Sequence, residues 1–137
     1  MATDVKRTAE RIEFLGDIIT GAIEGGIGYW SACSQYQWID RDERVRVSVG
    51  RQKGDEPRAT IHVIKDDESG YEPGGLALTL DTVERGLRLI REGGCEVNTR
   101  LKNAIMLADR SNEAGQLDAF DCDVIVQAGL LGEIVYA

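Results

Sequence analysis

Apolar and polar positions divide the chain into a helical beginning, a strand-rich middle and a helical end. Over residues 5–24 apolar side chains recur at helical spacing, and Gly25 and Gly26 follow, so the pattern predicts a helix that stops at the glycines. The next segment, residues 29–39, predicts a strand, with a helix as the alternative. In a strand, one face would carry alternate residues, namely Trp30, Ala32, Ser34, Tyr36 and Trp38.

Residues 44–65 contain two stretches in which polar or charged residues alternate with apolar ones. Alternation of this kind predicts strands with one solvated face, and the polar residues 50–57 between them predict an exposed loop. The segment therefore predicts an antiparallel hairpin. Residues 66–75 are rich in glycine and acidic residues and predict a second irregular loop.

The remainder of the chain predicts three helices and a short final strand. Each helix begins where a polar capping residue precedes apolar residues at helical spacing, and Gly93 with Gly94 ends the first of them. Residues 133–136 predict a strand that returns to the sheet. The expected N-terminal caps are Asp81 with Glu84, Asn98, and Asp118 with Asp121.

This order of elements predicts the α+β class. The expected architecture is a small antiparallel sheet of about three to four strands, with about four helices packed over one of its faces. A chain of 137 residues is long enough for one hydrophobic core, so residues 1–137 are expected to form a single domain.

Composition and charge narrow the class of protein. Apolar residues make up 42% of the chain and no apolar run is long enough to cross a bilayer, so we expect a folded, cytoplasmic protein that does not bind membranes. The formal net charge is −8, and residues 104–137 carry six acidic residues against one basic residue. Direct binding to nucleic acid is not expected, because it needs a basic footprint. A basic protein is the expected partner.

The residues that usually carry catalysis or bind metals are sparse. The three cysteines, Cys33, Cys95 and Cys122, are far apart and are expected to be reduced thiols. His62 is the only histidine, and alternation places it on the opposite strand face from Ile61. No feature of the sequence places a serine or cysteine beside His62, so no hydrolytic pair is predicted.

Nucleotide-binding, hydrolase and zinc-protease motifs are absent from the sequence, and no cofactor is predicted. An enzyme that uses carboxylates alone remains an alternative, since acids are available without a recognisable pairing motif. A small-molecule-binding domain is a related alternative. The carboxylates considered are Glu24, Asp40, Asp66 and Asp67.

Residues 110–121 partly match a calcium loop. If Gly115 is the turn glycine, Asn112, Asp118 and Asp121 occupy three ligand positions of an EF-hand. The first position is Arg110, however, where the pattern needs an aspartate. A degenerate or coincidental loop is the interpretation, the simpler alternative being a helix connection whose aspartates cap the next helix.

Two sets of residues are candidate contacts with a partner. Five carboxylates near the C-terminal end would form an acidic ridge that imitates nucleic-acid phosphates for a basic protein; a solvated helical surface is the alternative. The acidic set is Asp109, Glu113, Asp118, Asp121 and Asp123. Four aromatic residues would form either a buried packing centre, which is the first interpretation, or a recognition surface. The aromatic set is Tyr29, Trp30, Tyr36 and Trp38.

Three sequence blocks carry resemblances. EGGIGYW at residues 24–30, SQYQW at 34–38 and DVIVQAGLLGEIVY at 123–136 resemble small acidic proteins of actinobacterial phages and mobile elements. More remotely, Gly-Tyr-Trp before a short sheet and helices is similar to the ArdB/KlcA antirestriction proteins of plasmids. Their Asn-Gly-Gly turn is not reproduced at residues 34–37. The resemblance implies a non-enzymatic accessory protein that binds a host protein, such as a defence or DNA-modifying factor.

Other classes of function remain open beside this one. They are the small-molecule-binding or carboxylate-based enzyme domain, the degenerate calcium-loop protein, and a virion or assembly protein. The sequence sets neither the partner nor the oligomeric state.

Overall fold

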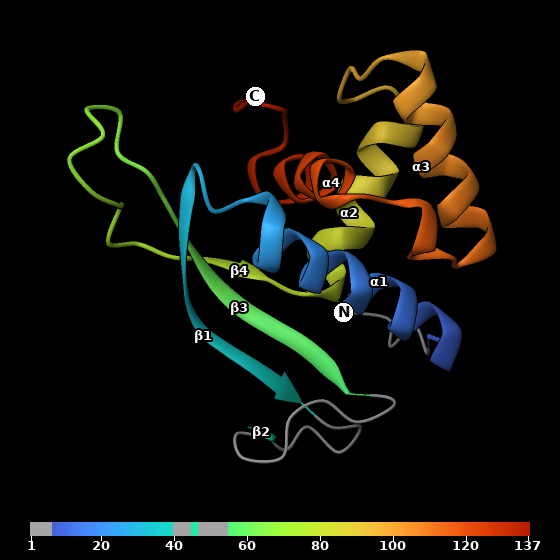
Figure 1. The fold of residues 1–137 in the computed structure, drawn as a ribbon, viewed down its shortest axis with the longest axis horizontal. Coiled ribbons are helices and arrows are strands. Elements are labelled where there is room, and N and C mark those ends of the chain that lie inside the picture. Colours follow the sequence, from blue (N-terminus) through green and yellow to red (C-terminus); the bar gives the residue numbers. More distant parts are fainter. Residues whose placement is uncertain (1–6, 40–44, 47–54) are drawn as a thin grey trace, which may run out of the picture.

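The computed structural model describes residues 7–39, 45–46 and 55–137, and only the backbone of residues 45–46. Within this part of the chain four α-helices accompany one antiparallel sheet with the strand order β2-β1-β3-β4, which confirms the predicted α+β class (Figure 1). The strands are β1 (Ser31–Ile39), β2 (Val45–Arg46), β3 (Glu56–Val63) and β4 (Leu76–Leu78). The α-helices are α1 (Ala9–Gly21), α2 (Leu80–Arg91), α3 (Thr99–Ser111) and α4 (Ala119–Leu131).

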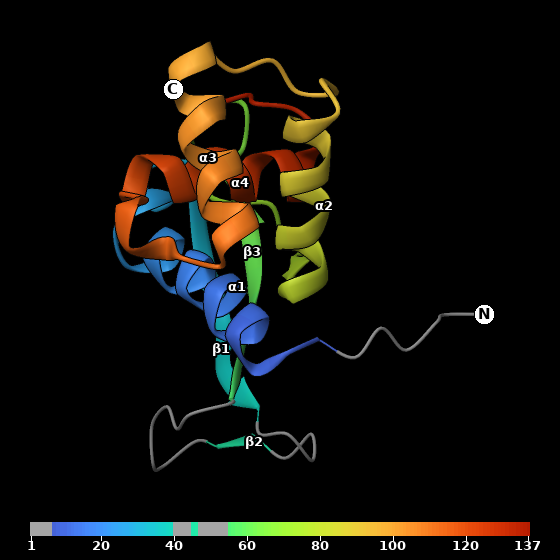
Figure 2. The ribbon, with the colours of Figure 1, turned by 90° about the vertical axis from the view of Figure 1, so that its right-hand side faces the viewer.

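The helices lie on one side of the sheet. Figures 1 and 2 show α1 beside β3, α2 and α4 next to it, and α3 on the outside of the helical layer. In β3 the alternate residues Pro57, Ala59 and Ile61 are buried against the helices, as the period of a strand requires. His62 lies on the opposite face from Ile61, as predicted. The core therefore sits between one sheet face and the helices, and the other face of β1 and β3 carries polar residues.

A β-bulge interrupts β1. Ser34 pairs with Thr60, but the next paired position is Gln37 with Arg58, and Gln35 lies between them with φ 52° in the left-handed region. A bulge shifts the alternation of side chains along its strand. The prediction of one continuous face for residues 30–38 is therefore wrong: Trp30 precedes the strand, and Trp38 follows the bulge.

The predicted hairpin over residues 44–65 is also wrong in its pairing. β2 pairs with β1 and not with β3. The two neighbours of β3 are β1 and β4. Alternation predicts which face of a strand is buried but not which strand lies beside it. β3 begins at Glu56, inside the predicted loop; residues 44, 47–49 and 50–54 of the predicted hairpin and loop lie outside the described residues.

The C-terminal segment forms no strand, so the predicted strand over residues 133–136 is wrong. Its backbone is bonded to one side chain instead. The amides of Val135 and Tyr136 both donate to Gln127 Oε1 at 2.8 Å, and Gln127 Nε2 donates to the Tyr136 carbonyl at 3.0 Å. The Gln127 amide thus replaces a neighbouring strand as the hydrogen-bonding partner.

Two of the three predicted helix caps are confirmed. The Asn98 side chain accepts from the Leu101 amide, and Asp118 and Asp121 accept from each other's amides. The predicted pair of Asp81 with Glu84 is wrong, because the N-cap of α2 lies two residues earlier, at Thr79, and Thr79 with Thr82 forms its capping box. The threonine hydroxyl takes the place of the expected Asp81 carboxylate at the cap, and the two acids are then available for other contacts.

Ion pairs of Glu84 and Asp109 join three helices. Arg11 of α1 contacts Glu84 of α2 and Asp109 of α3, whose carboxylate also binds Arg91. Burial alone would raise the pKa of Glu84, but the guanidinium groups of Arg11 and Arg7 outweigh that effect and hold the pKa below its usual value. These pairs link α3 to both α1 and α2.

The first helix ends differently from the prediction. α1 stops at Gly21 and continues as a π-helical turn, η1 (Ala22–Gly26), that includes both glycines expected to terminate it. A π-helical turn is rare and occurs frequently at functional sites. No helix in the described residues has the length and apolar character needed to cross a bilayer.

Candidate functional site

The five predicted ridge carboxylates do not share one exposed surface. Asp109 is 8% exposed and binds Arg11 and Arg91, while Asp123 is 2% exposed. Asp118 and Asp121 cap α4, and Glu113 is exposed. The continuous acidic ridge is therefore wrong as predicted, because two of its five members face the interior.

Asp123 lies at the centre of a buried hydrogen-bond network. Its Oδ1 atom accepts from Trp30 Nε1 at 2.8 Å and from Gln127 Nε2 at 2.9 Å, and its Oδ2 atom accepts from the Tyr29 hydroxyl at 2.5 Å. A buried carboxylate needs such donors, since its desolvation is costly. Because Gln127 also binds the C-terminal backbone, the network joins the start of β1, α4 and the C-terminal segment.

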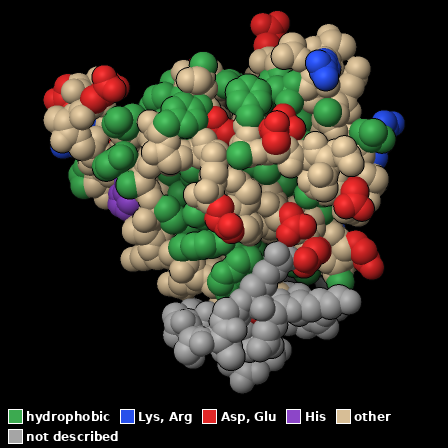
Figure 3. All heavy atoms as spheres, in the orientation of Figure 1, with side chains coloured by type: hydrophobic (Ala, Val, Ile, Leu, Met, Phe, Trp, Pro, Cys, Tyr) green, Lys and Arg blue, Asp and Glu red, His purple; other side chains and the backbone are tan. Residues whose placement is uncertain are grey.

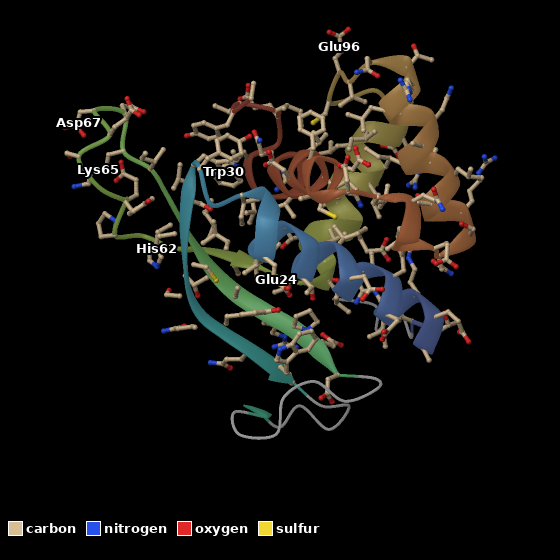
Figure 4. All side chains as sticks on the ribbon, in the orientation of Figure 1. Glu24, Trp30, His62, Lys65, Asp67 and Glu96 are labelled. Atoms are coloured by element: carbon tan, nitrogen blue, oxygen red, sulfur yellow. The ribbon has the colours of Figure 1, made fainter. Side chains whose placement is uncertain are left out.

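The aromatic candidates separate into buried and exposed residues. Trp30 is fully buried, and its ring stacks on that of Tyr136, with centroids 5.2 Å apart and planes at 2°. Figure 4 shows Trp30 near the start of β1, beside the C-terminal segment. Tyr29 is 51% exposed. Tyr36 and Trp38, with ring centroids 5.9 Å apart, lie farther along β1, Tyr36 within the bulge and Trp38 after it. Of these four residues, only Tyr29 and Trp30 belong to the Asp123 network.

A hollow opens on the outer side of this network. It has a volume of about 300 Å³ and is lined by Gly25, Gly26, Tyr29, Phe120, Asp123 and Ala137. Tyr29 and Phe120 are 51% and 57% exposed as residues, so both present apolar surface at the opening. We call this feature the Tyr29–Phe120 hollow. Its lining includes the buried Asp123 beside two exposed aromatic rings.

Glycines allow the π-helical turn to lie directly against α4. A Cβ atom on Gly26 would come within 3.0 Å of the Ala119 carbonyl oxygen, and one on Gly25 would touch the Ala119 side chain at 3.4 Å. The turn can approach α4 this closely only if residue 26 has no side chain, whereas the contact at Gly25 is an ordinary one. The glycines read from the sequence as a helix stop thus form one wall of the hollow.

The charge of Asp123 is opposed by neutral donors alone. Its three partners are a phenol, an indole and an amide, and within the described part of the chain no lysine or arginine forms an ion pair with it. Burial, followed by the hydrogen bond to Asp123, raises the pKa of Tyr29 to about 12, so the phenol stays protonated as a donor at neutral pH. A cation that entered the hollow would meet a carboxylate with no cationic partner of its own.

A second hollow lies on the other side of Tyr29. Its volume is about 360 Å³, and it shares Tyr29 and Ala137 with the first. The remaining lining residues are Ile64, Lys65, Asp66, Glu68 and Tyr136. Tyr29 is therefore a wall between two hollows, one of which contains exposed acidic residues from the loop after β3.

The predicted calcium-loop residues have other partners. Asn112 Oδ1 accepts from Arg11 Nη1 at 2.9 Å, and the carboxylates of Asp118 and Asp121 accept from the backbone of α4. Among the described residues no group of three or more histidine, cysteine, aspartate or glutamate side chains is arranged to hold a metal ion. Helix capping accounts for both aspartates of this segment.

The carboxylates considered for catalysis are not brought together. Glu24 lies in η1, whereas Asp67 lies in the loop after β3, and Figure 4 shows them in separate parts of the molecule. Asp66 is exposed in the same loop as Asp67, and Asp40 lies outside the described residues. The described part of this set supplies no pair of facing acids.

Two residues of the site were missed from sequence, although each carries a signal. Gln127 is the one polar side chain in the apolar run at residues 124–131, and an amide in such a run indicates a buried hydrogen-bonding role. Phe120 follows the helix cap Asp118 by two positions, in the first turn of α4. Its helical spacing with Val124 and Ala128 predicts a core position, whereas the structure exposes it.

The chain was compared with protein-family models, curated proteins and solved structures. No protein-family model, curated protein or solved structure matches the chain. The class that its fold and site define is an α+β domain with an aromatic hollow over a buried carboxylate.

Proposed function

We propose that this chain is a cytoplasmic accessory protein that acts by binding a basic host protein rather than by catalysis at this site. A lysine or arginine side chain of the partner enters the Tyr29–Phe120 hollow and lies against Asp123. The partner class is a nucleic-acid-binding protein, such as a defence or DNA-modifying factor. The phage or mobile-element origin rests on the sequence resemblance alone.

The observation that carries this proposal is the buried Asp123 carboxylate in the lining of an open hollow. Buried charges in proteins are usually paired with an opposite charge, and Asp123 is held by three neutral donors. Charge-assisted hydrogen bonds are shorter and stronger than neutral ones. A partner's cation would therefore gain an interaction that the domain does not make with its own described residues.

The exposed rings supply a second contribution. A cation over the face of a tyrosine or phenylalanine gains about 0.5–2 kcal/mol, depending on how far it is desolvated. Tyr29 and Phe120 both line the opening, so a lysine or arginine stem can pack against one ring while its head approaches the other. Aromatic residues around a desolvated pocket are typical of binding hot spots.

The overall charge favours a basic partner. The chain carries a net charge of −8, and Figure 3 shows acidic side chains scattered over the face that bears the C-terminal segment, with few basic ones. Such a surface attracts a cationic protein and speeds its association, and salt weakens this effect. Association driven in this way should fall as ionic strength rises.

Capture from a lysate of the native host tests the proposal. The tagged wild-type chain is compared with Phe120→Ser, which removes one wall of the hollow, and with Leu107→Ser as the matched control. Leu107 is exposed to the same degree as Phe120, 60% against 57%, but lies on α3 away from the hollow. We expect mass spectrometry to identify a basic protein that Phe120→Ser retains about tenfold less than wild type does.

The Leu107→Ser control and capture at increasing salt concentration show whether the hollow and the charge of the domain both contribute to binding. Leu107→Ser should retain the basic partner as wild type does, and moderate salt should weaken its capture. Equal capture by Phe120→Ser and wild type would contradict the role of the hollow. Recovery of the bait alone would contradict the host-protein partner and favour a small-molecule or self-assembling role.

A further inference from the structure

A serine and the only histidine meet on the sheet face that the helices leave uncovered. Ser34 of β1 pairs with Thr60, and His62 of β3 pairs with Ala32, so the two residues are diagonal neighbours on adjacent strands. Ser34 Oγ lies 2.9 Å from His62 Nε2. Both residues are half-buried, and Figure 4 shows His62 on the side of the sheet away from the helices. The pair is thus accessible to a small molecule.

The second ring nitrogen determines the direction of this hydrogen bond. His62 Nδ1 lies 3.0 Å from the backbone carbonyl oxygen of Glu72, and a carbonyl can only accept. In the neutral imidazole Nδ1 therefore carries the proton and Nε2 holds the free electron pair. The Ser34 hydroxyl is then the donor to Nε2. This is the arrangement of a serine nucleophile, a histidine base and a group that orients the base.

The backbone at Gly75 also lies against the imidazole ring of His62. A Cβ atom on Gly75 would lie 3.2 Å from His62 Cε1 and would overlap the Thr60 methyl group. Only glycine lets the segment before β4 lie against this part of the open face. Together with the Glu72 carbonyl, this contact restricts the ring to the orientation in which Nε2 faces Ser34.

The backbone beside Ser34 is irregular. The β-bulge begins at the next residue, Gln35, whose φ of 52° is unusual for a residue other than glycine. Bulges are over-represented next to active sites, where they reorient side chains and interrupt ladder hydrogen bonds. The nucleophile candidate thus stands at the one point where β1 departs from regular pairing with β3.

We propose that Ser34 is a base-activated nucleophile that cleaves small activated carboxylic esters. Ser34 Oγ bonds to the ester carbonyl carbon while His62 Nε2 accepts the hydroxyl proton. The bond to the leaving oxygen then breaks, and the proton passes from His62 to that oxygen, leaving an acyl group on Ser34. Water, deprotonated by His62, adds to the acyl carbon, and the bond to Oγ breaks as His62 returns the proton to Oγ, which releases the acid and restores the Ser34 hydroxyl. This activity shares no residue with the Tyr29–Phe120 hollow and goes beyond partner binding.

The test combines an active-site label with an ester assay on the full chain. Diisopropyl fluorophosphate should phosphorylate wild type at Ser34, with fluoride as the leaving group, and peptide mass mapping identifies the site. Ser34→Ala should remove the label and the hydrolysis of p-nitrophenyl acetate. His62→Gln should slow both reactions about 100-fold, the usual contribution of a general base. Ser111→Ala is the control, since Ser111 lies on α3 and should leave both rates unchanged.

Three results would overturn the proposal. The first is wild-type protein without label at Ser34, and the second is equal labelling of Ser34 in wild type and His62→Gln. The third is ester hydrolysis that persists in Ser34→Ala. Circular dichroism of each variant separates lost reactivity from lost folding. If His62→Gln fails to fold, Gly75→Ala tests the same point, since displacement of the ring should slow labelling of Ser34.

Discussion

Alanine at Gly129 or Gly86 is expected to destabilise the domain by about 3 kcal/mol, the upper part of the range for overpacked cores. The two glycines lie where α2 and α4 cross. A Cβ atom on Gly129 would come within 3.0 Å of the Thr82 carbonyl oxygen, and one on Gly86 within 3.0 Å of the Ile125 carbonyl oxygen. Since these are backbone atoms, no side chain can rotate away, and the helices must separate.

The sign of the change in the free energy of unfolding distinguishes a steric clash from the effect of helix propensity. In an open helix, glycine-to-alanine substitution stabilises by about 0.5–1 kcal/mol, so a destabilised variant shows that the clash outweighs propensity. Urea unfolding at neutral pH measures the free energy of unfolding. Gly28→Ala and Gly74→Ala, both outside the helices, are controls for an added methyl group without a clash, because nothing lies within 4 Å of an added Cβ at either position. A Gly129→Ala variant as stable as wild type would contradict the close crossing of α2 and α4.

Asp123→Ala is expected to lower the free energy of unfolding by about 2–6 kcal/mol. The substitution leaves Trp30 Nε1 and Gln127 Nε2 without the oxygen that both bind, and each unsatisfied buried donor costs about 1–3 kcal/mol. Asp123→Asn keeps the size and one acceptor oxygen, so it should cost less. Urea unfolding of both variants, with the indole NMR signal of Trp30 as a local reporter, measures the effect.

Tyr29→Phe provides the control for this series. It removes only the hydroxyl of a half-exposed side chain, so the loss should be about 1 kcal/mol. Equal stability of Asp123→Ala and wild type, or an unshifted Trp30 indole signal, would show that the carboxylate does not hold the network together.

Local chemistry in the sequence was sufficient to predict several element boundaries. Asn98 and the Asp118–Asp121 pair cap their helices because the side chains bind amides three residues away, a contact that depends on no distant part of the chain. Alternation likewise placed His62 opposite Ile61. The fold class followed from the order of such elements.

Contacts between distant segments could not be predicted in the same way. Ser34 and His62 meet because a particular register joins β1 to β3, and alternation is compatible with several registers. Asp123 was expected on the surface because acids usually are. Its burial depends on donors from Tyr29 and Trp30, more than 90 residues earlier in the chain.

Amide NMR spectra of the isotope-labelled chain, titrated with N-acetyl-lysine methylamide, test the cation-binding hollow most directly. N-acetyl-norleucine methylamide is the neutral control of similar length. We expect the lysine compound alone to shift the amides of Gly25, Gly26 and Phe120 and the indole signal of Trp30, and Phe120→Ser to reduce these shifts. Equal shifts with both compounds, or none with either, would contradict cation recognition by Asp123.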